Sequence, residues 1–277
     1  MIDDDKAAEA VRKAVEIGYR HLDTAQGYGN ERGVGGIRTC GLKREEVFVT
    51  TKLDAFIKDY DGTQAAIEGS LERLGLDYID LMIIHAPQPW TNFREDDHYF
   101  EGNLAAWCAM EKAYKAGRLR AIGVSNFQQV DIENLMQNGD VKPMVNQILA
   151  HVSNTPFPLI YYCHKHDILV EAYSPMGHGE MMKNTLVQDM AKQYGVSVAQ
   201  LCIRYCLQLN MLPLPKTASP KHMESNADVN FEISAQDMET LKNAERIKNY
   251  GDASLFPVYG GKMDKEGKCT PRDFFNE

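Results

Sequence analysis

The run Ile79-Asp-Leu-Met-Ile-Ile-His85 is apolar apart from one acid and stops on an imidazole. Two earlier runs are built in the same way: Tyr19-Arg-His-Leu-Asp-Thr-Ala25 has Asp23 near its end, and Glu46-Val-Phe-Val-Thr-Thr-Lys52-Leu53 has a lysine there. Short apolar runs of this length predict β-strands. The C-terminal ends of successive strands are where a (β/α) barrel gathers its chemistry. An acid, a phenol (Tyr28, just after the first run), an amine and an imidazole so placed predict one buried proton-transfer site.

Segments with helical and strand-like patterns alternate along the rest of the chain. Further strands are predicted at 120–125, 143–148, 168–173 and 211–215, with a Gly-rich loop after the first strand and a polar loop over 87–102. Helices are predicted near the N-terminus up to Gly18, through Ile67 to Gly75, through Leu104 to Gly117, over 128–138, 158–166, 185–194 and 197–208, and from Ser234. Strands and helices alternating at this spacing predict parallel strands joined by right-handed crossovers.

A barrel and an open doubly wound sheet both satisfy this alternation. The doubly wound alternative lacks its phosphate-binding Gly-x-Gly-x-x-Gly after any strand, because Gly33-Val-Gly35-Gly36-Ile-Arg38 has the wrong spacing and context. We therefore predict an α/β fold of the TIM type, a (β/α)8 barrel in which seven strands are found and one is missing. Residues 1–277 form a single domain in this prediction, and the Gly-, Pro- and aromatic-rich tail from Asn249 is an ordered loop.

Composition and charge limit the kinds of molecule that the protein is expected to bind. The chain has 277 residues, 44% hydrophobic and 25% charged, as in ordinary globular proteins, and its net charge of −9 argues against nucleic acid as the main partner. No apolar run approaches the ~20 residues of a membrane span, and the acidic start is unlike a signal peptide. The six cysteines form no Cys-x-x-Cys pair, and Cys202 and Cys206 predict buried thiols on one helix face. We expect a cytoplasmic protein with reduced thiols and no metal site.

Each strand-end residue also has a structural interpretation. Taken alone, Asp23 would cap a turn, and Tyr28 would be a packing residue with a wet hydroxyl. His85 is evenly balanced between a core imidazole and a functional one. Lys52 is less ordinary, because lysine is rarely buried without a partner. Four such groups at three strand ends together favour function, whereas His21, which forms a His-x-Asp pair with Asp23, is interpreted as structural.

Several segments together resemble the aldo-keto reductases in order and spacing, over almost the whole chain. They are Gly18-Tyr-Arg-His-Leu-Asp23-Thr-Ala-x-x-Tyr28-x-Asn30-Glu31, Thr51-Lys52-Leu53, Asp80-Leu-Met-Ile-Ile-His85, Gly123-Val-Ser-Asn-Phe127, Asn146-Gln147, Ala172-Tyr-Ser-Pro-Met-Gly177 and Pro215-Lys216-Thr217. The resemblance implies an eight-stranded barrel that binds NADPH across its C-terminal face, with the tail 249–277 over that face. It also implies reduction of a small carbonyl substrate by a monomer.

The resemblance assigns roles to the four strand-end groups. Tyr28 would be the general acid that protonates the carbonyl oxygen, and Lys52 would favour its phenolate, because a free phenol has a pKa near ~10. Asp23 would hold Lys52 by an ion pair and lie at the cofactor. His85 would orient the carbonyl and stabilise the developing oxyanion.

The resemblance also assigns a cofactor site. The nicotinamide carboxamide would meet Ser125, Asn126 and Gln147, and the ring would stack on Tyr173, which is followed by Ser174. Alone, Tyr173 would be a strand-packing residue. The adenosine 2′-phosphate would meet Lys216 and Thr217, with Ala218 contributing backbone and Lys221, His222 and Asn226 on the helical turn that follows. Alone, the two lysines would be a solvated surface pair.

The sequence departs from the family pattern in three ways. His222 stands where members typically carry an arginine on the 2′-phosphate, which leaves NADH open as the cofactor. Ala86 replaces the tryptophan that often follows the active-site histidine, widening the substrate pocket unless Trp90 folds back into it. The family's first strand, which ends in a Gly-Thr-Trp-like motif, is missing. Either the sequence is truncated, or the place of the missing strand is filled by the chain's own tail or by a partner chain. A partner chain in that place would make the protein an oligomer.

Three hypotheses follow. The first is a cytoplasmic NADPH-dependent reductase of aldehydes or ketones, which requires that the folded chain bind a nicotinamide cofactor. The second is a non-catalytic or impaired nicotinamide-binding barrel, which would bind the cofactor without turnover of small aldehydes. A metal-dependent hydrolase barrel is a distant third, and full activity of a metal-free preparation would dispose of it.

Overall fold

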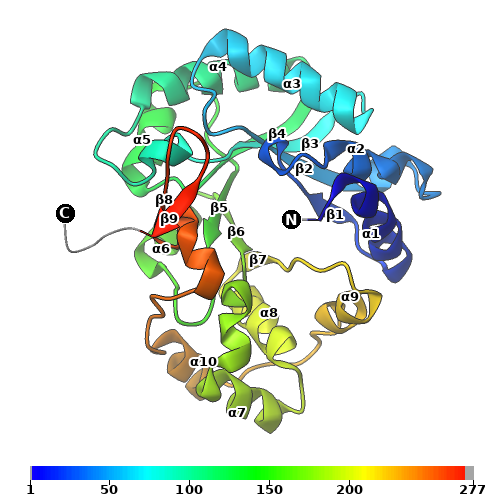
Figure 1. Cartoon of the computed structure of the whole chain (residues 1–277), viewed down its shortest axis with the longest axis vertical. Coiled ribbons are helices and arrows are strands. Elements are labelled where there is room, and N and C mark those ends of the chain that lie inside the picture. Colours follow the sequence, from blue (N-terminus) through cyan, green and yellow to red (C-terminus); the bar gives the residue numbers. More distant parts are fainter. Residues whose placement is uncertain (1, 272–277) are drawn as a thin grey trace. The chain divides into compact units, whose positions relative to one another are not determined.

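The computed structural model describes residues 2–271, so Met1 and residues 272–277, the end of the predicted tail, lie outside the described residues (Figure 1). One sheet has seven strands, in the order β1 to β7. They are β1 His21–Asp23, β2 Phe48–Leu53, β3 Ile79–Ile84, β4 Leu119–Ser125, β5 Val145–Leu149, β6 Leu169–Tyr173 and β7 Met211–Leu214. The order of a doubly wound sheet reverses at a switch point, whereas this order follows the chain. The barrel prediction is confirmed.

The helices also follow the sequence pattern. They are α1 Asp4–Ile17, α2 Glu31–Val34, α3 Tyr60–Leu74, α4 Phe100–Lys115, α5 Gln129–Asn138, α6 Phe157–Lys165, α7 Thr185–Tyr194, α8 Val198–Gln208, α9 Pro220–Ala227 and α10 Ala235–Lys242. A capping box forms at the start of α8 between Ser197 and Gln200. Gly75 ends α3 in the left-handed conformation (φ 65°), as its position after the apolar pattern predicts.

Two predicted loops carry regular structure. The segment after β1 contains α2 and the 3₁₀ turns η1 Gln26–Tyr28, η2 Gly35–Thr39 and η3 Arg44–Glu46. The tail contains η6 Gly251–Leu255 and η7 Pro257–Tyr259, followed by an antiparallel pair, β8 Gly261–Met263 and β9 Cys269–Pro271. Two further 3₁₀ turns are η4 Trp90–Asn92 and η5 Gly177–Lys183.

The prediction of a loop is wrong for this part of the tail, because a tight turn joins β8 and β9 into a hairpin. The Asp264 carboxylate accepts hydrogen bonds from the backbone N–H groups of Glu266 and Lys268, and Gly267 adopts a φ of 81°. Asp and Gly at these places are the turn signals of a hairpin. The strands themselves are too short and too polar to be recognised by apolar alternation.

The chain divides into two compact units. Unit 1 comprises residues 1–89, 96–146 and 218–223, and unit 2 comprises residues 90–95, 147–217 and 224–277. In unit 1, α3 and α4 lie side by side (Figure 1), and β3 is buried along its whole length. Leu81 and Ile83 of β3 pack against Val145. In unit 2, the tail residues Tyr250 and Ala253 pack against Leu149.

The strand register brings the polar strand ends together. Asp23, the last residue of β1, lies opposite Thr50 of β2, and Lys52 is two residues further along β2. Alternate residues of a strand point to the same face, so the Asp23 and Lys52 side chains share one face of the sheet. Leu53 lies opposite Ile84, which places His85 directly beyond the paired end of β3. Among residues 2–271, no helix is long and apolar enough to cross a membrane.

Candidate active site

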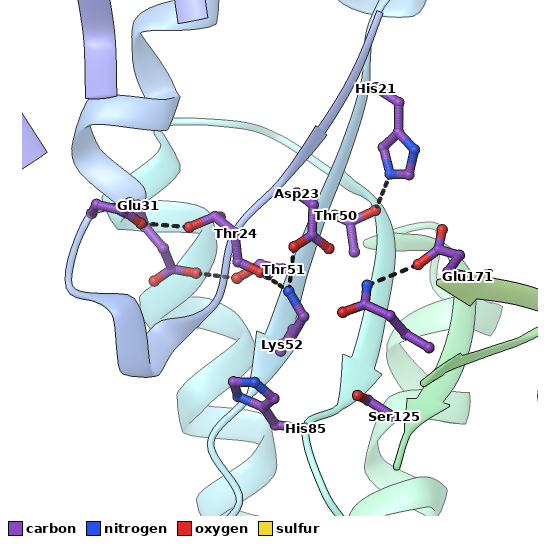
Figure 2. A network of polar contacts seen from close by, with 12 residues as sticks. His21, Asp23, Thr24, Glu31, Thr50, Thr51, Lys52, His85, Ser125 and Glu171 are labelled. Atoms are coloured by element: carbon purple, nitrogen blue, oxygen red, sulfur yellow. Dashed lines mark hydrogen bonds and ion pairs between the residues drawn. The ribbon is translucent and has the colours of Figure 1, made fainter. Parts of the chain in front are cut away.

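Lys52 is the centre of the site. Its side chain is 1% exposed, and Nζ donates to Asp23 Oδ1 at 2.5 Å and to the Thr24 carbonyl oxygen at 2.8 Å. Figure 2 shows the Lys52 amine directed at Asp23 and Thr24, with His85 nearby. A buried ammonium is stable only when it is paired and hydrogen-bonded, and both conditions are met here. Asp23 therefore holds Lys52 in place, as the sequence predicts.

Tyr28 ends a tight turn that is anchored on both sides. Gln26 Nε2 donates to Ser70 Oγ at 2.8 Å, while Gln26 Oε1 accepts from the Asp54 backbone N–H at 2.9 Å. Gly29 leaves the turn with a φ of 67°, a conformation that glycine adopts without strain. The turn residue Tyr28 is thus held on a framework of helix and strand ends.

Tyr28, Lys52 and His85 lie together. Lys52 Nζ is 4.9 Å from the centroid of the Tyr28 ring. The rings of Tyr28 and His85 meet edge to face, with centroids 5.7 Å apart and planes at 75°. All four predicted catalytic residues therefore lie within unit 1, in one cluster at the C-terminal ends of β1, β2 and β3.

The protonation states of this cluster follow from burial and charge. Burial raises the pKa of Tyr28 above its ordinary value, and the charge and hydrogen bond of Lys52 oppose that rise without overcoming it. Burial, followed by the positive charges of Lys52 and Lys58, holds the pKa of His85 well below its usual range. At neutral pH the site presents a protonated phenol and a neutral imidazole. Lys52 acts in the predicted direction, but the net shift of Tyr28 is upward because desolvation is the larger effect.

Glu31 stabilises the segments that carry the catalytic cluster, although it is not among the predicted site residues. It is 2% exposed and accepts a hydrogen bond from Thr51 Oγ1 at 2.6 Å (Figure 2). It also pairs with Arg73 Nε at 2.6 Å. Thr51 precedes Lys52 on β2. Glu31 thereby ties the segment after Tyr28 to the strand that carries Lys52. The signal in the sequence was an acid directly after Asn30, which reads as an exposed turn residue until its burial is known.

The predicted carboxamide residues are held in fixed orientations. In unit 1, Ser125 is 1% exposed, and Asn126 adopts a φ of 62° while its Nδ2 donates to the His85 carbonyl oxygen at 3.0 Å. In unit 2, Gln147 is 2% exposed and its Nε2 donates to Glu171 Oε2 at 2.9 Å. A hydroxyl and two amides supply the donors and acceptors that a carboxamide needs.

The other predicted cofactor residues differ in exposure. Ser174 Oγ lies 2.7 Å from Tyr259 Oη, so the tail contacts the segment after Tyr173 within unit 2. Lys216, Ala218, Lys221 and His222 are exposed, and Thr217 is partly exposed. Asn226 is 6% exposed on α9. An exposed group of cations in a chain of net charge −9 matches the chemistry of a bound phosphate.

Comparison with known proteins decides the family. Residues 1–246 match the sequence model of the Aldo/keto reductase family. The chain belongs to the aldo-keto reductase family. It is 41% identical to the glyoxal reductase of Bacillus subtilis over 257 residues, covering 91% of this chain and 89% of that protein. It is 39% identical to the 9,11-endoperoxide prostaglandin H2 reductase of Trypanosoma cruzi over 254 residues, covering 90% of this chain and 86% of that protein.

Solved structures agree. An aldo-keto reductase of Bombyx mori in complex with NADP superposes with a TM-score of 0.79 at 32% identity, covering 93% of this chain and 89% of that one. An aldo-keto reductase from a deep-sea metagenome library has a TM-score of 0.82 at 36% identity, with 88% of each chain covered. This aldo-keto reductase is therefore an NAD(P)H-dependent oxidoreductase that acts on small carbonyl compounds, and its described residues form seven strands of a barrel consistent with the (β/α)8 fold of its family. Membership of this family excludes the hydrolase alternative.

Lys58 is a half-buried lysine close to His85, and the sequence analysis did not predict it as a site residue. Burial lowers its pKa to about 7, against the attraction of Asp131 and Asp54. In the sequence it stands in Ile57-Lys58-Asp59, which reads as a polar turn before α3. No local pattern separates it from an exposed lysine, because its burial depends on α4, a distant segment.

The lowered pKa of Lys58 predicts a pH-dependent contribution to stability. Between about pH 7 and about pH 10.4, an unfolded Lys58 holds a proton that the folded one has released, so unfolding free energy rises with pH. From pH 7 to pH 9, the wild type should gain up to about 2 kcal/mol relative to Lys58→Met in urea titrations. The exposed Lys112 gives the matched control, and Lys112→Met should run parallel to the wild type. Parallel curves for Lys58→Met would show that Lys58 titrates normally.

Proposed function

We propose that this aldo-keto reductase reduces aldehyde or ketone carbonyls to alcohols with NADPH, and that Tyr28 is the general acid. The observation that carries the proposal is the Asp23–Lys52 ion pair beneath the Tyr28 ring, with Nζ 4.9 Å from the ring centroid. Reduction of a carbonyl to an alcohol requires one hydride, from the cofactor, and one proton, which must come from the protein. Tyr28 is the group placed to give that proton.

Tyr28 is suited to hold its proton until the carbonyl oxygen becomes basic. Its raised pKa keeps the phenol protonated at neutral pH. As negative charge develops on the substrate oxygen, the nearby Lys52 ammonium stabilises the phenolate that proton transfer leaves behind. Asp23 keeps the ammonium charged and in position.

His85 is suited to bind the substrate oxygen as a neutral donor. Its low pKa means that the imidazole carries one N–H and no net charge at neutral pH. A neutral donor stabilises the developing oxyanion without competing with Tyr28 as a proton source. The Asn126 amide binds the His85 carbonyl oxygen at 3.0 Å, which fixes the backbone on which the imidazole stands.

The residues present fit a nicotinamide cofactor. When bound, NADPH would supply the hydride to the carbonyl carbon. In unit 1, Ser125 and Asn126 would bind the carboxamide, Asp23 would serve the nicotinamide end, and Ala218 and His222 would hold the adenosine end. In unit 2, Gln147 would bind the carboxamide and Tyr173 the nicotinamide ring, while Ser174, Lys216, Thr217 and Asn226 would hold the phosphates and adenosine. Binding of NADP by a relative of the same fold supports this assignment.

In unit 1, we propose Tyr28, His85 and Ala86 as residues of the substrate pocket, and in unit 2 the family resemblance proposes Trp90. Ala86 is fully buried, and Trp90 packs against Phe93 at a centroid distance of 5.3 Å. In unit 2, Tyr259 of the tail reaches Ser174, one of the proposed cofactor residues. Small aldehydes are the first substrates to test, because a relative of this chain is named glyoxal reductase.

The direct test is NADPH consumption by the purified chain in the presence of glyoxal, followed at the nicotinamide absorbance. Turnover that depends on both NADPH and the aldehyde supports the proposal. Tight NADPH binding without turnover of glyoxal or larger aldehydes and ketones would contradict carbonyl reduction. A failure to bind either nicotinamide cofactor would contradict the cofactor assignment.

His222 gives a prediction about cofactor preference. A guanidinium at this position would offer the 2′-phosphate a planar pair of donors that an imidazole lacks. We expect His222→Arg to lower the Kd for NADPH about tenfold and to leave the Kd for NADH within about twofold. Fluorescence titration with both cofactors measures this, and NADH serves as the internal control. An equal gain for both cofactors would show that residue 222 does not meet the 2′-phosphate.

A further inference from the structure

The segment that follows His85 is held by hydrogen bonds to its main chain. It runs from Ala86 to Tyr99, the residue before α4. Lys58 Nζ donates to the Ala86 carbonyl oxygen at 2.7 Å, one residue after the imidazole. The same ammonium donates to Asn103 Oδ1 at 2.8 Å. Lys58 therefore links the start of this segment to the first turn of α4.

Asn103 reaches both ends of the segment. It is 1% exposed, and its Nδ2 donates to the Pro87 carbonyl oxygen at 2.8 Å and to the His98 carbonyl oxygen at 3.0 Å. Both amide hydrogens are thus used, while Oδ1 accepts from Lys58. One buried side chain joins residues that are eleven positions apart in the sequence, Pro87 and His98.

The far end of the segment has a second anchor. His98 Nδ1 contacts Asp131 Oδ1 at 2.6 Å, and Asp131 Oδ2 accepts from the Gln128 backbone N–H at 2.8 Å. The packing here is close: a Cβ at Gly102 would stand 2.9 Å from the carbonyl oxygen of Lys58. The groups around Lys58 are therefore fixed by α4 and α5 and are not a loose surface cluster.

The arrangement is costly for the fold, which argues for a functional reason. Burial lowers the pKa of Lys58 to about 7, and its positive charge contributes to the low pKa of His85. The charged groups that act on Lys58 are Asp131 from α5 and Asp54 from the end of β2. An apolar side chain would pack against α4 without desolvating an amine, but it would leave the Ala86 carbonyl oxygen without this donor.

We propose that Lys58 and Asn103 are positioning residues that staple the 86–99 segment beside His85, and that the stapled segment selects among carbonyl substrates. Neither residue is assigned a contact with the substrate. Their effect is on where Ala86 and Pro87 stand, and hence on the wall of the pocket next to the imidazole. This inference rests on the proposed function, because the selected molecules are its carbonyl substrates.

Two substitutions break the staple in different ways. Lys58→Met removes the donor to Ala86 at nearly constant side-chain volume. Asn103→Asp keeps the acceptor for Lys58 and removes the donors to Pro87 and His98, so it loosens the segment even if the first variant does not fold. Lys112→Met is the matched control: it removes an exposed amine from α4 that lies 5.7 Å over the Tyr60 ring, away from the staple.

The experiment measures amide hydrogen exchange, NADPH affinity, and kcat and KM for glyoxal and the bulkier phenylglyoxal. We expect faster exchange confined to residues 86–99, NADPH affinity within about twofold of wild type, and a change of about fivefold or more in the ratio of kcat/KM between the aldehydes. Unchanged exchange in 86–99 of a folded variant would overturn the staple. Faster exchange with an unchanged ratio would overturn its role in selection. Absence of turnover in the wild type would instead overturn the proposed function, while the exchange data would still judge the staple.

Discussion

Replacement of Tyr28 by phenylalanine is expected to lower kcat for aldehyde reduction by about a thousandfold, within the range by which a positioned general acid accelerates a reaction. The variant removes one hydroxyl and keeps the ring that lies edge to face with His85. The ammonium of Lys52 and the imidazole of His85 remain, but neither replaces the lost proton donor at the same place. Steady-state turnover with NADPH and glyoxal measures the effect.

NADPH affinity should stay within about twofold in Tyr28→Phe, since the proposed role of the hydroxyl is in the reaction and not in cofactor binding. Tyr161→Phe is the control, because Tyr161 is 71% exposed on α6 and its hydroxyl loss should change neither quantity. If Tyr28→Phe kept more than about a tenth of wild-type kcat, another group would have to supply the proton.

The strand ends were predictable because two strong local signals coincide there. The buried run of β3 and the mostly buried run of β2 predict their own secondary structure, and a polar residue at the end of such a run is unusual enough to mark a site. The parallel register then brings Asp23, Lys52 and His85 to one edge without further information. The same logic placed Ser125 at the end of β4.

The pKa shifts of the site residues, and the burial that causes them, could not be predicted from the sequence. Spacing shows that Lys52 can approach Tyr28, but not that burial of the phenol outweighs the attraction of the ammonium. Desolvation is a property of everything packed around a group, and it is set by segments far away in the chain. The same reason hides Glu31, whose burial depends on Thr51 and Arg73, and Lys58, whose partners lie after His85 and on α4.

Replacement of Lys52 by methionine is the second large effect expected, and comparison with Asp23→Asn separates its causes. Lys52→Met removes the positive charge that opposes the rise in the pKa of Tyr28, while Asp23, which raises that pKa, remains. The phenol becomes a weaker acid, and kcat should fall by about a thousandfold or more. Asp23→Asn keeps an ammonium beside Tyr28, so its loss of kcat should be smaller.

For the free energy of unfolding we expect the opposite order, with Asp23→Asn losing more stability than Lys52→Met. Lys52 is 1% exposed and Asp23 is 19% exposed, so removing Asp23 strands the more deeply buried charge. Loss of one partner from a buried ion pair costs about 3–5 kcal/mol, and we expect Asp23→Asn to lie nearer this range than Lys52→Met, whose remaining carboxylate can reach water. Urea unfolding and steady-state turnover of both variants measure the two orders. Because one substitution should be worse for activity and the other for stability, a simple loss of folding cannot produce both results. If the same variant were the worse one in both measurements, the ion pair would serve the fold alone, and Lys52 would have no separate part in proton transfer.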